Sequence, residues 1–207
     1  MTDHLAFPGN PLLDRELEEI DPADICGPGL TVGTVPTKRE VRDATRAKLA
    51  KEVTAGIVPG CDIYGLTKGQ FDLRYLLESV LDRVGPADLV ISTWTASTTD
   101  IERIQHWEKS KKITRARFIL DFSFQRRKPQ VVHAIRAAFG DASIRLTKLH
   151  CKFALISNAR WTMVVRGSAN LNDNHRIEDF HIADDPRIYG LLLDFVNRSF
   201  ARKFQAL

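Results

Sequence analysis

The chain has 207 residues, enough for one full hydrophobic core with a small appended segment but too few for two comfortable domains. Its apolar fraction of 43% excludes wholesale disorder, and a net charge of +4 is too small to indicate a polyanionic partner by itself. No apolar stretch approaches the length of a membrane-spanning helix, so we expect a protein that does not enter a membrane.

The first sixty residues differ from the rest. Residues 1–36 are rich in proline and glycine and predict an extended arm or irregular cap, with one short helix at Leu12–Ile20. Thr37 or a neighbour is expected to cap a helix that runs to Ala55, where Gly56 ends it. That helix has only a thin apolar stripe, suited to packing on the domain or to assembly.

From Cys61 onward, strand and helix patterns alternate. In chain order, strands are expected at residues 62–66, 87–93, 117–122, 143–146, 150–157, 161–166 and 178–183, and helices at 71–84, 98–107, 129–139 and 186–204. Alternating strands and helices followed by a hairpin predict an α/β fold with a mixed sheet. We therefore divide the chain into an N-terminal extension, residues 1–60, and one domain, residues 61–207.

Two polar residues open the strand expected at 150–157. In a strand His150 and Lys152 point to the same side, and Cys151 points into the opposite layer. An imidazole can attack phosphorus, and a neighbouring ammonium group can stabilise charge on the phosphoryl oxygens. The alternative is a solvated hairpin in which both residues are incidental.

The next strand leads into a second polar motif. Gly167-Ser168-Ala169-Asn170 follows the apolar run at 161–166, and Glu178 lies eight residues further on. Ser168 and Asn170 alternate onto one face, where they offer neutral hydrogen-bonding groups to a phosphate.

Together these motifs resemble the pattern of the phospholipase D superfamily, in the form that carries a single His-x-Lys motif. The resemblance spans roughly residues 71–200, and the residues that match are His150, Lys152, Gly167, Ser168 and Asn170. Glu178 stands where many members have a glutamate that bonds the catalytic histidine. The motif aspartate falls on Ser157, which lies on the opposite face from His150; in the family that aspartate is mostly a structural anchor.

The resemblance implies a phospholipase D-like α/β sandwich, with a mixed central sheet and helices on both faces. It also implies a metal-independent phosphodiesterase with no cofactor, working as a homodimer in which two copies of the motif meet. His150 of one subunit would form a phosphohistidine, and His150 of the other would serve as acid and then base. Lys152 and Asn170 would hold the phosphoryl oxygens with Ser168 assisting, and Glu178 would fix the histidine tautomer.

Other residues suggest the substrate. Trp94 and Thr93 follow a core strand at the expected rim of the site, where Trp94 can stack on a base or simply pack on its neighbours, and Thr93 can contact phosphate. Basic residues cluster around Asp121 and near the C-terminus, as phosphate-binding residues or as solvated charges. Nucleic acid, DNA or RNA, is therefore favoured over phospholipid, and a nuclease over a phospholipase.

The histidines and cysteines outside the motif give weaker signals. His175 and His181 flank Glu178, and either is an alternative acid within one subunit. No spacing indicates a metal site. Three widely spaced cysteines and the lack of a signal-peptide pattern favour a reducing compartment, so we expect a cytoplasmic protein.

A different class of function stays open. Ser157 in place of the motif aspartate, together with the proline-rich arm, suits a catalytically weak or inactive protein that binds nucleic acid or serves in assembly, such as a phage or mobile-element component.

Overall fold

The computed structural model describes residues 39–43, 49–171 and 177–201. The expected N-terminal arm with its short helix, and His175, lie outside these residues. Within them, the strands form one eight-stranded sheet in the order β1-β2-β8-β7-β6-β3-β4-β5. The strands are β1 Glu40–Asp43, β2 Asp62–Thr67, β3 Ala87–Thr93, β4 Ile113–Asp121, β5 Ile144–Thr147, β6 Phe153–Ser157, β7 Thr162–Gly167 and β8 Glu178–Asp184.

The sheet is mixed, and its antiparallel part lies in the middle. β2, β8, β7, β6 and β3 pair antiparallel in that order. β1 joins β2 in parallel at one end, and β4 and β5 continue in parallel from β3 at the other. The expected α/β class and mixed sheet are confirmed.

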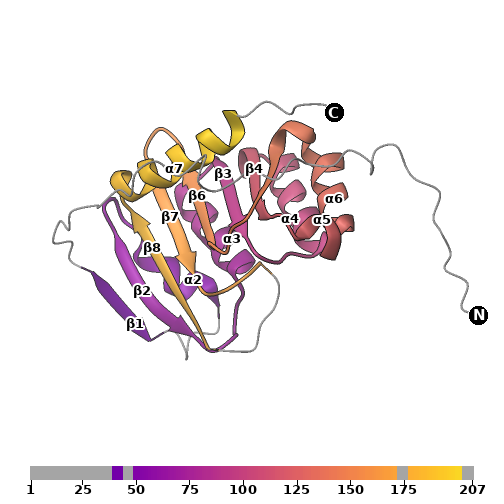
Figure 1. Cartoon of the computed structure of the whole chain (residues 1–207). Helices are drawn as coiled ribbons and strands as arrows, with labels where there is room; N and C mark the ends of the chain where they lie inside the picture. Colours follow the sequence, from indigo (N-terminus) through magenta and orange to yellow (C-terminus); the bar gives the residue numbers. More distant parts are fainter. Residues whose placement is uncertain (1–38, 44–48, 172–176, 202–207) are drawn as a thin grey trace, which may run out of the picture.

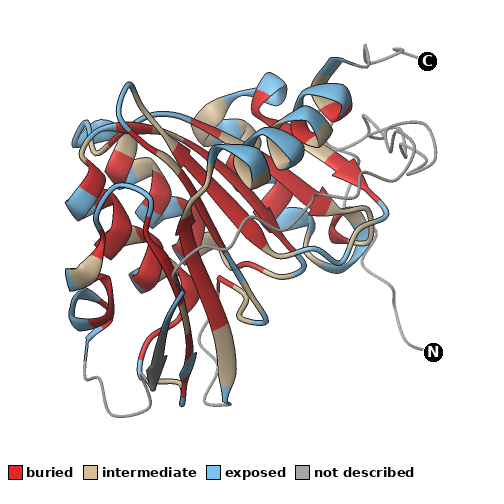
Figure 2. Cartoon of the chain, turned by 90° about the vertical axis from the view of Figure 1, so that its left-hand side faces the viewer, coloured by how far each residue is buried: buried red, intermediate tan, exposed pale blue. Residues whose placement is uncertain are grey.

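Helices cover both faces of the sheet (Figure 1). One face carries α2 Ala50–Val53, α3 Leu73–Val84, α4 Thr98–Lys109, α5 Phe124–Arg127 and α6 Pro129–Phe139, with 3-10 turns at Thr54–Gly56 and Asp141–Ser143. The other face carries α7 Pro186–Ala201, which packs on β6 and β7. Figure 2 shows the buried strands between these two layers.

Local signals account for the helices that begin and end where we expected. Asp72 caps α3 by accepting a hydrogen bond from the Tyr75 amide at 2.9 Å. Gly85 ends the same helix with φ of 80°, a conformation that glycine adopts without strain. Ser97 and Asp100 form a capping box on α4, and α6 opens with a proline.

One expected element is wrong. The helix predicted from Thr37 to Ala55 is a strand at Glu40–Asp43, and within the described residues of this segment the helical part is Ala50–Val53 and the turn after it. β1 pairs with β2, so the backbone groups of this segment find partners at a sheet edge. A helix with so thin an apolar stripe would bury little apolar surface, so it would gain less free energy than the strand gains by pairing with β2. Ala50 and Val53 lie in the main core, so this segment is part of the domain.

A polar network on the α7 face of β2, β7 and β8 has two buried members, His181 and Asp62, and two exposed arginines, Arg166 and Arg39. Arg166 Nε donates to His181 Nδ1 at 2.9 Å, and His181 Nε2 lies 2.8 Å from Asp62 Oδ1. Asp62 also accepts two hydrogen bonds from Arg39. Because Nδ1 is an acceptor here, the proton of the neutral ring is on Nε2 and points at Asp62. His181 is 3% exposed and bonded on both sides, so it is a structural residue rather than the accessible acid considered above.

This network makes stability depend on pH. Burial lowers the pKa of His181 below its ordinary value; Asp62 opposes this shift, and Arg166 and Arg39 add to it. The unfolded chain therefore takes up a proton on this ring at a higher pH than the folded chain does. Stability should be complete above about pH 6.5 and should fall on acidification, by at most about 1.4 kcal/mol per pH unit for this one group.

Urea unfolding at several pH values between 8 and 5 measures the effect. His181→Gln keeps an acceptor for Arg166 and a donor for Asp62 without titrating, so it should lose less stability on acidification than the wild type. His133→Gln, on an exposed position of α6, is the matched control and should follow the wild type. Equal acid sensitivity of all three proteins would contradict the assignment.

Candidate active site

The strand register brings the motif residues to one edge of the sheet. Ser92 pairs with Phe153, Phe153 with Arg166, and Gly167 with Phe180. The C-terminal ends of β3 and β7 and the N-terminal ends of β6 and β8 therefore meet there. Every site residue named from the sequence lies at or beside these strand ends. These residues are Thr93, Trp94, His150, Lys152, Ser168, Asn170 and Glu178.

His150 lies in the connection before β6, not in the strand itself. The strand begins at Phe153, three residues later than expected, because residues 150–152 have no ladder partner. The alternation that we assumed for them does not hold: Cys151 is exposed rather than buried in the opposite layer. His150 is exposed and Lys152 is half-buried.

Two side chains hold this connection in place. Ser92 Oγ, which is fully buried, donates to the Cys151 carbonyl at 2.8 Å. Asp121 Oδ2 accepts from the Leu149 amide at 3.3 Å. The backbone on both sides of His150 is therefore anchored to β3 and β4, and the imidazole projects from a positioned segment rather than from a free loop.

Trp94 lies beside His150. The two ring centroids are 5.5 Å apart and the rings are inclined by 59°. Trp94 is the first residue after β3, and part of its ring is exposed. The structure thus brings together a predicted nucleophile and a predicted stacking residue from segments 56 positions apart.

The Gly-Ser-x-Asn turn is joined to β8 by reciprocal hydrogen bonds. The Ser168 amide donates to Asp179 Oδ1 at 2.9 Å, and the Asp179 amide donates to Ser168 Oγ at 3.0 Å. The same Ser168 hydroxyl donates to Glu178. Gly167 is required by space: a Cβ there would lie 2.2 Å from the Asp179 carbonyl oxygen. Glycine is therefore needed at this position because two backbones approach closely, and not because its φ is unusual.

The remaining predicted residues are less open. Asn170 is half-buried, and its Oδ1 is a buried acceptor without a hydrogen-bond partner among the described residues. Such an atom costs free energy unless a ligand or water satisfies it. Thr93 is fully buried, and its hydroxyl donates to the Thr95 carbonyl at 3.0 Å, so it shapes the segment that carries Trp94.

Ser157, at the position of the motif aspartate, lies at the far end of β6 from His150. Its hydroxyl accepts a hydrogen bond from Tyr189 of α7 at 2.7 Å. Phe153 and Leu155, on the same face of the strand, belong to the cluster under α7, so Ser157 faces α7 as well. It anchors a helix to the sheet and has no direct route to a phosphate at the opposite end of the strand.

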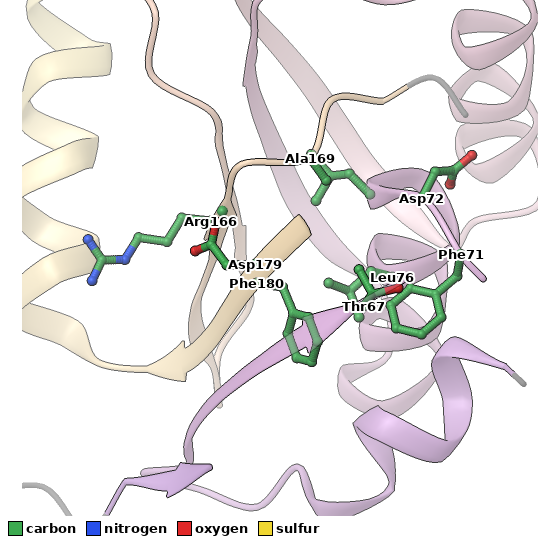
Figure 3. Close-up of a pocket in the computed structure, with 10 residues that line it drawn as sticks. Thr67, Phe71, Asp72, Leu76, Arg166, Ala169, Asp179 and Phe180 are labelled. Carbon is green, nitrogen blue, oxygen red and sulfur yellow. The ribbon is translucent and has the colours of Figure 1, made fainter. Parts of the chain in front are cut away.

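A shallow hollow lies behind the turn, between α3 and the ends of β2, β7 and β8 (Figure 3). Phe71 and Phe180 face each other there with ring centroids 6.2 Å apart. Its lining is mostly apolar, and Arg166 points away from it. His150 and Lys152 are not among its lining residues.

Across residues 39–43, 49–171 and 177–201, no cluster of three or more His, Cys, Asp or Glu side chains is arranged to hold a metal ion. In the same part of the chain, no helix has the length and apolar character to cross a membrane.

Sequence reasoning did not predict that Ser92 and Asp121 anchor the segment around His150; it considered Ser92 only as a possible phosphate contact. Ser92 follows directly after the apolar run Leu89-Val90-Ile91, and that break in the pattern was the available signal. Asp121 is the single acid within a basic cluster, and it faces inward to bond Leu149 and Ser123 rather than to balance the surrounding charges.

A comparison of the sequence with models of known protein families finds no match, and a comparison with curated proteins finds none at a significant level. Solved structures do share the fold. A polyphosphate kinase from Porphyromonas gingivalis superposes with a TM-score of 0.50 at 11% identity, over 70% of this chain and 27% of the kinase. The likeness shows that the two chains share a fold over the region that superposes. The chain spans about a quarter of the length of that kinase.

Two further structures are similar at lower scores. A phosphatidylserine synthase from Haemophilus influenzae Rd KW20 has a TM-score of 0.45 at 13% identity, over 66% of this chain and 37% of the synthase. TrmBL2, an archaeal chromatin protein, has a TM-score of 0.41 at 11% identity, over 70% of this chain and 54% of that protein.

The close approach at Gly167 yields a prediction. Gly167→Ala should push β7 and β8 apart, break the reciprocal bonds of Ser168, and cost about 1–3 kcal/mol of unfolding free energy. Gly190→Ala is the matched control: nothing lies within 4 Å of its added Cβ, and in the interior of α7 alanine should be neutral or stabilising. Urea unfolding compares the variants, and equal stability of the two would contradict the steric argument.

Proposed function

We propose that the protein is a metal-independent phosphodiesterase, and most specifically a nuclease, that works through His150 at a site shared across a homodimer. The observation that carries the proposal is the meeting of His150 and Lys152, Ser168 and Asn170, and Glu178 at one open sheet edge. The match of these residues to the superfamily motif, and the fold likeness to a polyphosphate kinase, support phosphoryl transfer there.

In the first step His150 attacks the phosphorus of a bound diester. A P–N bond forms as the P–O bond to the leaving group breaks, and the leaving oxygen takes a proton from the partner's His150. Lys152 supplies a positive charge to the phosphoryl oxygens, which gain negative charge in the transition state. The Asn170 side-chain NH2 group can donate a hydrogen bond to these oxygens. Its buried Oδ1, an acceptor without a partner among the described residues, suits a water or a substrate group that donates.

In the second step the partner's His150, now neutral, removes a proton from water. The resulting hydroxide attacks phosphorus, the P–N bond breaks, and His150 is regenerated along with a phosphomonoester. Glu178 is proposed to fix the histidine tautomer, and Ser168 holds that carboxylate by its hydrogen bond. One motif supplies a nucleophile but no second histidine, which is why the reaction calls for two copies of the chain.

The nucleophile is tested by substitution. His150→Ala should lower hydrolysis of labelled single-stranded and double-stranded DNA and RNA by at least about 1000-fold with little change in stability, since the ring is exposed. Each assay is run both with and without EDTA. His133→Ala, exposed on α6, is the control and should keep parental activity.

Parental activity of His150→Ala would overturn the proposed nucleophile, and loss of all activity in EDTA would overturn metal independence. A wild-type protein that binds nucleic acid but cleaves no diester would instead favour a binding or assembly role. Ser157 is hydrogen-bonded to Tyr189 of α7, at the far end of β6 from His150, so Ser157 alone does not favour the binding or assembly role.

The shared site is tested by mixing. Wild-type and His150→Ala chains, refolded together in equal amounts, distribute into dimers of which about one quarter carry two intact copies. At constant total protein, activity should fall to about one quarter of the wild-type value if each site needs both histidines, and to about one half if each chain acts alone. The second result, or a monomer in sedimentation with full activity, would exclude the shared site.

A further inference from the structure

An arginine that the proposed reaction does not use is fixed on the ring of Trp94. The guanidinium carbon of Arg127, at the end of α5, lies 4.2 Å from the Trp94 ring centroid. Its Nη2 donates to the Trp94 carbonyl at 3.2 Å and its Nε donates to Ser123 Oγ at 2.8 Å. Ser123 is in turn held by Asp121, the same residue that anchors the segment before His150. Asp121 therefore helps to position both the Trp94–Arg127 pair and the segment that carries His150.

The exposure of Trp94 sets it apart from the other tryptophans. Trp107 and Trp161 are 0% and 5% exposed and fill the core, whereas Trp94 is 36% exposed. Its neighbour on the site side is the His150 ring, at 5.5 Å. A large aromatic that packed only for stability would be expected to bury more of its ring.

Arg127 forms no ion pair with an acid in the part of the chain that the structure describes. Among the described residues, Arg103, Arg115 and Arg198 each form an ion pair with a carboxylate, and Arg127 forms none. Its partners are a carbonyl, a hydroxyl and two aromatic rings, Trp94 and Phe124, all neutral. Arg126 and Lys128 on either side add positive charge. An exposed arginine of this kind, beside a site proposed for phosphates, is suited to an anionic ligand.

We propose that Trp94 and Arg127 form a subsite for one nucleotide next to the scissile phosphate, and that the substrate is a single-stranded nucleic acid. The base stacks on the platform that the tryptophan and guanidinium make, and Arg127 contacts the neighbouring phosphate. A base within a duplex is covered on both faces by its neighbours, so it reaches such a platform only after unstacking. The inference rests on the proposed function, because it places the diester at His150.

Binding rather than cleavage is measured, so that the two proposals fail separately. His150→Asn, which prevents turnover, serves as the parent, and fluorescence anisotropy reports its affinity for three ligands. They are a twelve-residue oligothymidylate, an abasic oligomer of equal charge, and a twelve-base-pair duplex. When Trp94→Ala is added to this parent, the affinity for oligothymidylate should fall about tenfold, within the range for one stacked base. The affinity for the abasic oligomer should change less than about twofold. Arg127→Ala should weaken both single strands.

Arg160→Ala is the matched control, since Arg160 also lies over a tryptophan ring, Trp161 at 5.2 Å, but at the opposite edge of the sheet. It should leave all three affinities unchanged, and the duplex should bind more weakly than oligothymidylate. Equal losses for thymidylate and abasic ligands in Trp94→Ala would refute stacking. A loss in Arg160→Ala equal to that in Arg127→Ala, or a duplex bound as tightly as the single strand, would refute the subsite. If the wild-type protein cleaves no nucleic acid but the binding results are as expected, the nuclease proposal is rejected and the subsite proposal is retained.

Discussion

The position of β6 between β3 and β7 is the constraint on which the site depends. Its register sets Phe153 opposite both Ser92 and Arg166, and so places the His150 segment next to the Gly-Ser-x-Asn turn. Successive side chains in a strand face opposite ways, so a slip of one residue would exchange the faces of Ala154 and Leu155. Both faces are covered by apolar side chains, one set under α3 to α6 and one under α7, and this burial holds the register.

The two halves of the site are secured by different means. The Gly-Ser-x-Asn turn is tied to β8 by the reciprocal bonds between Ser168 and Asp179, which continue the ladder beyond its last pair. The His150 segment has no ladder and relies on side-chain bonds from Ser92 and Asp121 to its backbone. Removing the buried hydroxyl of Ser92 would leave the Cys151 carbonyl without its hydrogen-bond partner, which lowers stability. The bond therefore keeps this segment well defined although it is not part of the sheet.

Elements with strong local signals were predictable from the sequence. β3 and α6 have the expected bounds because Gly85-Pro86, Pro129 and Gly140 mark their ends. β1 was missed because its stability comes from pairing with β2 some twenty residues away, which no local pattern reveals. The motif residues were found by resemblance, whereas the contact of Arg127 with Trp94 joins segments that only the folded sheet brings together.

The order of elements along the chain has a consequence for synthesis on the ribosome. The face of the sheet that contains Val90, Ile119, Leu155 and Val164 is closed by α7, the last helix described. Until residues 186–201 have emerged, a nascent chain with its central strands already complete presents that apolar surface to its surroundings. Chaperone binding during translation is therefore expected to concentrate on this face, and to end when α7 docks.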